Sequence, residues 1–331
     1  MKTFLILTIL LSLSFLWANT VPVVEITSVV QRQDGSRLVD IIYNLTDADG
    51  DEMYVTLQVS SDGGSTYSLT CTQVTGDVGI DVLSGNGKQI VWDAGIELPN
   101  VQGDNFFFKV IAEDMYVVDI DGNVYRTVQI GNQVWMAENL KVTRYRNGDL
   151  IPTGHSNSAW TGLSTGAQCV YNNNASNELD TYGRLYNWYA VVDSRGLATE
   201  GWRVPSDDDI KQLEMALGMT QVEADAEGYR GTNQGSHLAG RVDLWYDGAL
   251  DSNPQFGASG FNFLPGGGRE WANEGSFVWA TISGYFWSST EYDNSNGRYR
   301  NLAFDFTTVN RSCSYKPDGY SVRCVRSVEL Q

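Results

Sequence analysis

The sequence predicts a mainly β protein with two domains, an antiparallel β-sandwich followed by an α+β domain with two helices and long loops. Residues 21–114 alternate apolar and polar side chains with a period of two, which is typical of half-buried strands. Near Met115 this alternation gives way to aromatic residues and to long Gly, Asn and Ser loops, with two segments of helical periodicity between them. The 331 residues are enough for about two domains.

Residues 1–18 are predicted to be a signal peptide. Lys2 supplies a basic start, Phe4–Trp17 is an apolar stretch too short to span a bilayer comfortably, and Ala18 offers a small residue for cleavage. We therefore expect a mature chain that begins at Asn19 and is secreted, held at the cell surface or kept in the periplasm. An uncleaved anchor is the alternative, and no membrane insertion is expected after cleavage.

The net charge of the chain restricts the classes of partner that it is expected to bind. Forty acidic and 22 basic residues give a formal net charge of −18, whereas a nucleic-acid partner requires a basic surface. The same charge argues against adhesion to an anionic membrane. We interpret the acidity as a solubility feature rather than as a cation-binding one.

The first domain is expected over residues 19–115, with no helix. Three segments each place apolar side chains on one face, and "SDGG" (residues 61–64) predicts a turn. The faces are Val39, Ile41, Tyr43 and Leu45; Met53, Val55, Leu57 and Val59; and Phe106, Phe108, Val110 and Ala112. Short alternating strands with Gly and Asp turns are typical of a β-sandwich.

One turn of this domain, "DADGD", carries Asp47, Asp49 and Asp51 and resembles the opening of a calcium loop. An EF-hand needs glycine at its sixth position and glutamate at its twelfth, and Glu52 and Gln58 occupy them here. A solvated turn is favoured, and calcium bound in another geometry is the alternative.

The second domain is expected over residues 116–331. "GRLYNWYAVVDSRGL" (residues 183–197) places Leu185, Trp188, Tyr189 and Val192 on one helical face. "DIDGN" (residues 119–123) predicts a hairpin turn.

A second helix is predicted in "GWRVPSDDDIKQLEMAL" (residues 201–217). Ser206 and Asp209 form a capping-box pattern, and Asp207 and Asp208 fall in the first turn, where the helix dipole favours negative charge. Neighbouring helical side chains point about 100° apart, so the three aspartates do not converge on one ion. They begin a helix.

Four cysteines in an exported chain suggest disulfides. Cys313 and Cys324 lie close together near the C-terminus, where a bond between them could join two strands. Cys71 and Cys169 are far apart in sequence, and a free, buried Cys71 is favoured over their pairing.

Five motifs occur in order: "DIDGNVYRTVQIGNQVWMAENLKV", "YGRLYNWYAV", "GWRVPSDDDIKQLE", "GYFWSSTEY" and "YSVRCVR". Together, over residues 117–328, they resemble the Fibrobacter succinogenes major paralogous domain of bacterial secreted and surface proteins. "GWRVPS" and "VRCVR" are similar to elements of formylglycine-generating-enzyme-like proteins and of the wider C-type lectin-like fold. The resemblance implies two helices, a small twisted sheet, functional loops and a disulfide between the final strands, which Cys313 and Cys324 would suit. The first domain resembles fibronectin type III-like or immunoglobulin-like modules, which implies a spacer or binding role.

The sequence offers no catalytic constellation. Formylglycine-generating chemistry uses two closely spaced cysteines, and Cys313 and Cys324 are much farther apart. The chain lacks a nucleophile elbow, an H-E-x-x-H pair and a P-loop. His155 and His237 are interpreted as loop or packing residues, and "PGGGRE" (residues 265–270) as a flexible loop. A carboxylate pair of a polysaccharide-acting enzyme is the alternative, although no spacing singles one out.

Candidate ligand contacts are mostly aromatic. A flat exposed ring can stack on a sugar or anchor a protein interface, and the alternative is that these rings build the core. The candidates in polar loops are Trp160, Trp245, Tyr246, Trp271 and Trp279, while Trp135, Trp188, Trp202 and Trp287 are expected in the core. "WSSTEYDN" adds Glu291, Asp293 and Asn294 as oxygen ligands for calcium, although the usual calcium-lectin motifs are absent.

We therefore expect an exported, non-catalytic binding or adhesion protein of the cell surface or extracellular space. The expected partner is a glycan or a cell-surface protein, with calcium as an optional cofactor. The alternatives are a polysaccharide-acting enzyme and a structural surface subunit.

Overall fold

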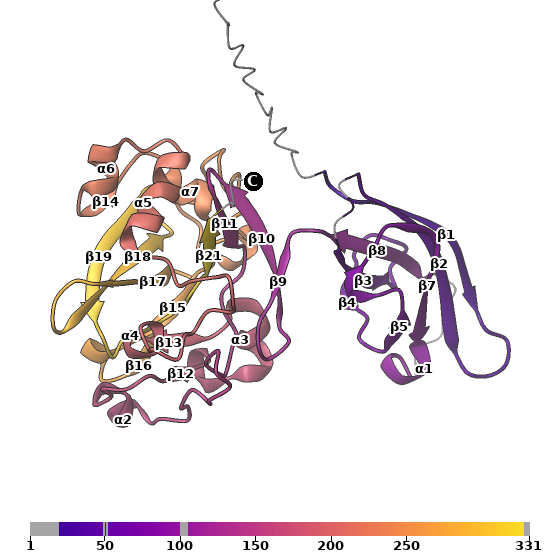
Figure 1. Ribbon diagram of the computed structural model, residues 1–331, viewed down its shortest axis with the longest axis horizontal. Coiled ribbons are helices and arrows are strands. Elements are labelled where there is room, and N and C mark those ends of the chain that lie inside the picture. Colours follow the sequence, from indigo (N-terminus) through magenta and orange to yellow (C-terminus); the bar gives the residue numbers. More distant parts are fainter. Residues whose placement is uncertain (1–19, 49, 51, 100–104, 328–331) are drawn as a thin grey trace, which may run out of the picture. The chain divides into compact units, whose positions relative to one another are not determined.

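The computed structural model describes residues 20–48, 50, 52–99 and 105–327, which divide into two compact units, residues 20–114 and 115–327 (Figure 1). Both are mainly β, with antiparallel sheets. The expected signal peptide, residues 1–18, lies outside the described residues. Within the described ranges, no helix has the length and apolar character needed to cross a membrane.

The first unit contains two four-stranded sheets with one shared core. One sheet has the order β1-β2-β7-β5, and in the other β3 pairs with β4, β6 and β8. The bounds are β1 (Val23–Gln31), β2 (Leu38–Thr46), β3 (Met53–Ser60), β4 (Leu69–Thr70), β5 (Val74–Gly76), β6 (Gly79–Val82), β7 (Gly85–Asp93), α1 (Ala94–Glu97) and β8 (Phe107–Glu113).

Periodicity predicted the buried faces of this unit correctly. The apolar faces predicted for β2 and β3 are buried and pack together, with the face predicted for β8 against them. The prediction that this unit has no helix was wrong, because residues 94–97 form the single helical turn α1. The side chain of Asp93 caps this turn by accepting a hydrogen bond from Ile96 N.

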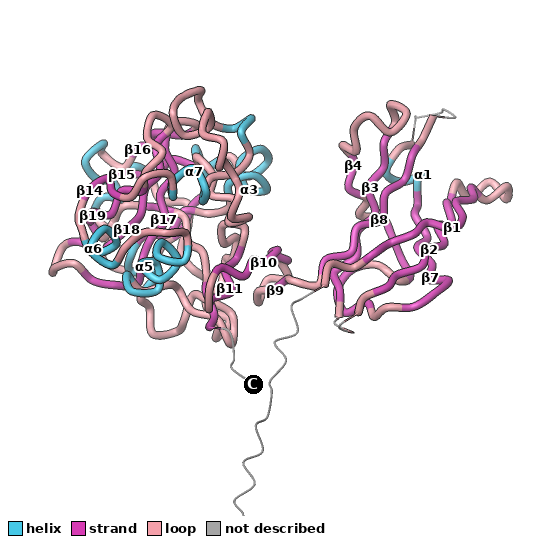
Figure 2. Tube along the Cα trace, turned by 90° about the horizontal axis from the view of Figure 1, so that it is seen from above, coloured by secondary structure: helices cyan, strands magenta, loops and turns pink. Residues whose placement is uncertain are grey.

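The second unit has a four-stranded sheet, β21-β11-β10-β9, and a nine-stranded sheet, β12-β13-β20-β15-β17-β18-β19-β14, with β16 beside β15. Figure 2 shows short helical turns between long loops. The strands are β9 (Tyr116–Val118), β10 (Val124–Ile130), β11 (Gln133–Met136), β12 (Gln168–Cys169), β13 (Leu185–Asn187), β14 (Gly228–Arg230), β15 (Gly266–Glu270), β16 (Ser276–Ala280), β17 (Ser283–Glu291), β18 (Asn296–Ala303), β19 (Val309–Tyr315), β20 (Gly319–Tyr320) and β21 (Val325–Ser327). The helices are α2 (Asn157–Thr161), η1 (Tyr171–Asn173), α3 (Ala175–Tyr182), α4 (Trp188–Val191), α5 (Asp207–Ala216), α6 (Gln221–Asp225), α7 (Gln234–Leu238), η2 (Val242–Leu244) and η3 (Trp271–Asn273).

The three consecutive aspartates begin α5, as predicted. Ser206 and Asp209 form a reciprocal capping box, with Asp209 N donating to Ser206 Oγ and Ser206 N donating to Asp209 Oδ2. Asp208 points to solvent, with a side chain 84% exposed.

Asp207 has a further role, because it joins a buried ion network that the sequence did not reveal. Arg300 donates to Asp207 at 2.8 Å and to Glu214 at 2.7 Å, Arg311 donates to Asp207 at 2.7 Å, and Arg230 donates to Glu214 at 2.6 Å. Burial raises the pKa of Asp207, but the hydrogen bond from Arg311 and the charge of Arg300 outweigh it and leave this pKa well below its usual range. The network fixes α5 to β18 and β19.

Two local predictions in this unit were wrong. Residues 183–197 do not form one helix, because Leu185–Asn187 is strand β13 and only Trp188–Val191 is helical. "PGGGRE" is not a flexible loop but holds β15, an inner strand of the large sheet. A Cβ on Gly267 would lie 2.3 Å from Val278 O, and one on Gly268 would lie 2.7 Å from the ring of Tyr320. The glycines therefore allow close strand packing.

The expected Cys313–Cys324 disulfide is also wrong, because all four cysteines are free. Cys313 lies on β19, opposite Arg298, whereas Cys324 is buried beside β11 and accepts a hydrogen bond from Met136 N. Cys324 directly precedes β21 of the four-stranded sheet, whereas Cys313 lies in β19 of the nine-stranded sheet. Cys71 is free and buried, as favoured, and burial raises its pKa to about 12.

Candidate functional site

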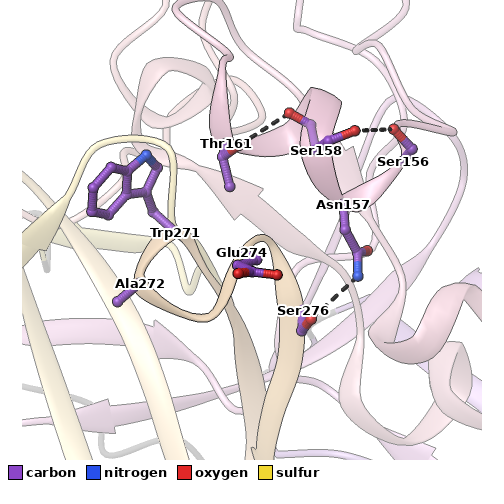
Figure 3. Close-up of a pocket in the computed structure, with 8 residues that line it drawn as sticks. All are labelled: Ser156, Asn157, Ser158, Thr161, Trp271, Ala272, Glu274 and Ser276. Carbon is purple, nitrogen blue, oxygen red and sulfur yellow. Dashed lines mark hydrogen bonds between the residues drawn. The ribbon is translucent and has the colours of Figure 1, made fainter.

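A pocket of about 810 Å³ opens between α2 and the turn that joins β15 to β16 (Figure 3). Its lining combines hydroxyl, amide, carboxylate and indole groups. The lining residues are Ser156, Asn157, Ser158, Thr161, Trp271, Ala272, Glu274 and Ser276.

Gly275 holds the two walls of the pocket together. Its φ is +75°, and a Cβ atom there would lie 2.2 Å from the carbonyl oxygen of Asn157 in α2. Across the same contact, Asn157 Nδ2 donates to Ser276 Oγ at 3.2 Å. A residue larger than glycine would push α2 away from β16.

Arg269 connects the two walls of the pocket through hydrogen bonds. It is fully buried, and it donates to His155 O and Asn157 Oδ1 on one wall and to Gly275 O on the other. Its guanidinium lies 4.4 Å from the ring centroid of Trp160, a buried residue of α2. Because Arg269 engages Asn157 Oδ1, the Asn157 amide presents its N–H groups toward Ser276.

Trp271 forms an exposed platform at the rim, with 44% of its surface accessible. Its ring centroid lies 4.8 Å from that of Tyr315, and its backbone N–H donates to Asp318 Oδ1 at 2.5 Å. Ser314 Oγ donates to the other oxygen of Asp318. Burial raises the pKa of Asp318 to about 6. With both oxygens bonded and the residue buried, Asp318 anchors the platform and does not face the pocket.

These groups suit a ligand with many hydroxyls and an apolar face. Glu274 is exposed and has φ +56°, a sparsely populated backbone conformation for a residue other than glycine. Its carboxylate accepts hydrogen bonds, the Ser and Thr hydroxyls donate and accept them, and the indole offers a stacking surface. Figure 3 shows Trp271 and Glu274 on one side of the opening and Thr161 on the other.

Of the five aromatic candidates, Trp271 alone lines this pocket. The prediction that Trp160 and Trp245 contact a ligand was wrong, because both side chains are buried. Trp245 Nε1 also donates a hydrogen bond to Gly240 O. Both side chains are therefore closed to a ligand. Tyr246 and Trp279 are exposed but lie outside the pocket lining. The four tryptophans expected in the core are buried there.

Sequence reasoning missed Asn157, Thr161 and Glu274. They are common polar residues in unpatterned loops, and the one available signal was that Trp160 and Trp271 both lie in such loops. His155 is half-buried, and its ring packs against Trp160, in agreement with a packing role.

The acidic loop after β17 already contains a cation. The ammonium group of Lys316 donates to Glu291 Oε1 and, at 2.9 Å, to Asn294 O, while Asp293 accepts hydrogen bonds from Ser295 N and Asn296. The expected calcium ligands therefore bind Lys316 and the local backbone. No group of three His, Cys, Asp or Glu side chains that could hold a metal occurs in the part of the chain that the structure describes.

Of the other three calcium candidates, the structure describes only Asp47. Asp49 and Asp51 lie outside the described residues, and Asp47 Oδ2 accepts a hydrogen bond from Gly50 N. That bond is typical of an Asp-initiated turn.

The model of the Fibrobacter succinogenes major domain matches residues 128–326, which include the pocket, both of its walls and Asp318. No curated protein and no solved structure gives a significant match. The chain belongs to the Fibrobacter succinogenes major domain family.

Proposed function

We propose that this member of the Fibrobacter succinogenes major domain family is an exported binding protein that holds a glycan in the Trp271 pocket without cleaving it. The observation that carries the proposal is the pairing of an exposed, anchored indole with a pocket lined by hydroxyl, amide and carboxylate groups. A sugar ring needs both features, because its C–H face stacks on an aromatic ring while its hydroxyls form hydrogen bonds.

The finer fold assignments belong to the same proposal. The second unit is a C-type lectin-like domain, and the first is a fibronectin type III-like or immunoglobulin-like module that serves as a spacer. The two antiparallel sheets around one core support the assignment of the first unit as a sandwich module. The loop-borne pocket supports the assignment of the second unit as a C-type lectin-like domain. The N-terminal signal supports export to the cell surface or the extracellular space.

Calcium is not part of this binding site. The eight lining residues include one carboxylate, that of Glu274, whereas protein calcium sites usually use six to eight oxygen ligands with several carboxylates. We therefore expect glycan binding to survive a chelator.

The test is a glycan array of the mature chain, residues 19–331, followed by calorimetry on the glycans that bind. Trp271→Ala should weaken binding roughly tenfold, in line with the loss of one stacked ring. Trp279→Ala is the matched control, because Trp279 is exposed to a similar extent, 48%, but lies outside the pocket.

Equal affinities for the two variants would move the site away from the pocket. If the folded protein binds no glycan, the proposed ligand class is wrong. Release of reducing ends from a bound polysaccharide would instead support an enzyme.

A further inference from the structure

We infer that the ligand is an internal stretch of an uncharged polysaccharide chain, which crosses the pocket and continues over Tyr315 to Tyr292. This inference rests on the proposed function, because it uses the same site. It adds the length and the charge of the glycan.

A row of side chains with an exposed tyrosine at each end leads away from the pocket. Tyr315 of β19 is the register partner of Asn296 in β18, and residues directly opposite each other in an antiparallel pair point to the same face. Tyr292 directly follows Glu291, the partner of Gly297, and its N–H donates to Asn296 O at 3.0 Å. Tyr315 of β19, Asn296 of β18 and Tyr292, the residue that follows β17, therefore form a row.

The row begins at the pocket rim, because the ring of Tyr315 lies 4.8 Å from that of Trp271. Neighbouring strands are about 4.8 Å apart, so Tyr292, two strands away, lies roughly 10 Å from Tyr315. A single sugar ring is too short to fill the pocket and reach Tyr292. A chain of several sugars can contact Trp271, Tyr315 and Tyr292 in turn.

The row is exposed and held in place. Tyr315 and Tyr292 are both exposed, at 44% and 50%. The guanidinium of Arg298 lies 4.4 Å from the Tyr292 ring centroid and is itself ion-paired with Glu227. A fixed ring loses little entropy when a ligand stacks on it.

The opposite face of these strands is closed to a ligand. A Cβ atom on Gly297 would lie 2.3 Å from Cδ1 of Trp188, which packs in the core. Binding is therefore confined to the face that carries the row.

The charges along this path favour an uncharged chain. Glu274 and Asp293 present exposed carboxylates, whereas Lys316 is paired with Glu291 and Arg298 with Glu227. The whole chain adds a net charge of −18. Uronate or sulfate groups would meet repulsion at both ends of the path.

The experiment is calorimetry with cello-, xylo- and manno-oligosaccharides of two to six units, and with oligogalacturonates as charged probes. For an uncharged series that binds, we expect affinity to rise at least tenfold between two and five units. Oligogalacturonates should bind more weakly at every length.

Tyr292→Ala should lower affinity for the five-unit ligand about fivefold and leave the two-unit ligand unchanged, whereas Trp271→Ala should weaken both. Tyr246→Ala is the matched control, since Tyr246 is an exposed tyrosine outside the path. An affinity that levels off at two units, or a Tyr292→Ala variant equal to wild type, would overturn the extended path while leaving the glycan proposal intact. Tighter binding of oligogalacturonates would overturn the uncharged chain. Failure of every series and of the glycan array would overturn both proposals.

Discussion

The backbone N–H of Trp271 donates a hydrogen bond to Oδ1 of Asp318, a residue that is only 3% exposed. The rim of the pocket is thereby attached to the segment between β19 and β20. Ser314 donates to the other carboxylate oxygen, and Tyr320 lies within 3.1 Å of Ser314 Oγ. The position of the exposed indole therefore depends on a buried carboxyl group.

Replacement of Asp318 by asparagine should change how stability depends on pH. Burial raises the pKa of Asp318 from 3.8 to about 6, so between these values the folded chain keeps a proton that the unfolded chain releases. The free energy of unfolding must then fall as pH rises through this window, by up to about 3 kcal/mol from this group, and level off above it. Urea denaturation gives the free energy of unfolding at pH 4.5 and at pH 7. The decrease between these two pH values should be smaller in Asp318→Asn than in wild type.

Asp208→Asn is the control for this measurement, because the side chain of Asp208 is 84% exposed. It should keep the wild-type dependence. If Asp318→Asn also keeps it, the raised pKa is wrong.

Gly275→Ala should separate the walls of the pocket. Gly275 and Gly201 have nearly equal φ values, +75° and +77°, so alanine costs each about 1 kcal/mol of backbone strain. A Cβ atom at Gly275 additionally lies 2.2 Å from Asn157 O, whereas nothing lies within 4 Å at Gly201. We expect Gly275→Ala to unfold about 1–3 kcal/mol more easily than Gly201→Ala and to bind glycan more weakly. Matching denaturation midpoints and affinities would contradict the role of Gly275.

Glu214→Gln should destabilise the second unit by about 3–5 kcal/mol, because it leaves Arg230 and Arg300 buried without their shared counter-ion. Asp208→Asn, in the same helix, should change stability by less than about 1 kcal/mol. Urea denaturation followed by tryptophan fluorescence compares the two variants. Similar midpoints would show that the network contributes little.

Glu291→Gln should leave any calcium-induced rise in melting temperature unchanged, because Lys316 already supplies the cation at Glu291. Calorimetric scans of wild type and variant, with calcium and with a chelator, make the comparison. A calcium shift seen in wild type and lost in the variant would identify Glu291 as a calcium ligand.

The features that local sequence determines were predictable. The alternation in β2 and β3 identified their buried faces, because a strand places every second side chain on one side. Ser206 and Asp209 identified the start of α5, since a capping box needs residues only three positions apart.

The features that depend on distant partners were not predictable. The glycines of β15 are required by Val278 and Tyr320, and Trp160 is buried because Arg269 and Phe277 pack nearby. The pocket combines α2 with a turn more than a hundred residues later in the chain, so no single motif encodes it. Only the Trp271 rim could be suggested from the sequence, as an aromatic residue in a polar loop.

The pairing of β21 with β11 has a consequence for the order in which the second unit forms. Val325 is the register partner of Trp135, and its backbone also exchanges hydrogen bonds with Arg203. The pairing of β11 with β21 therefore joins two segments that are almost a whole domain apart in the sequence. The closure of so long a loop slows folding. Until β21 arrives, one edge of β11 remains unpaired and open to association with other chains.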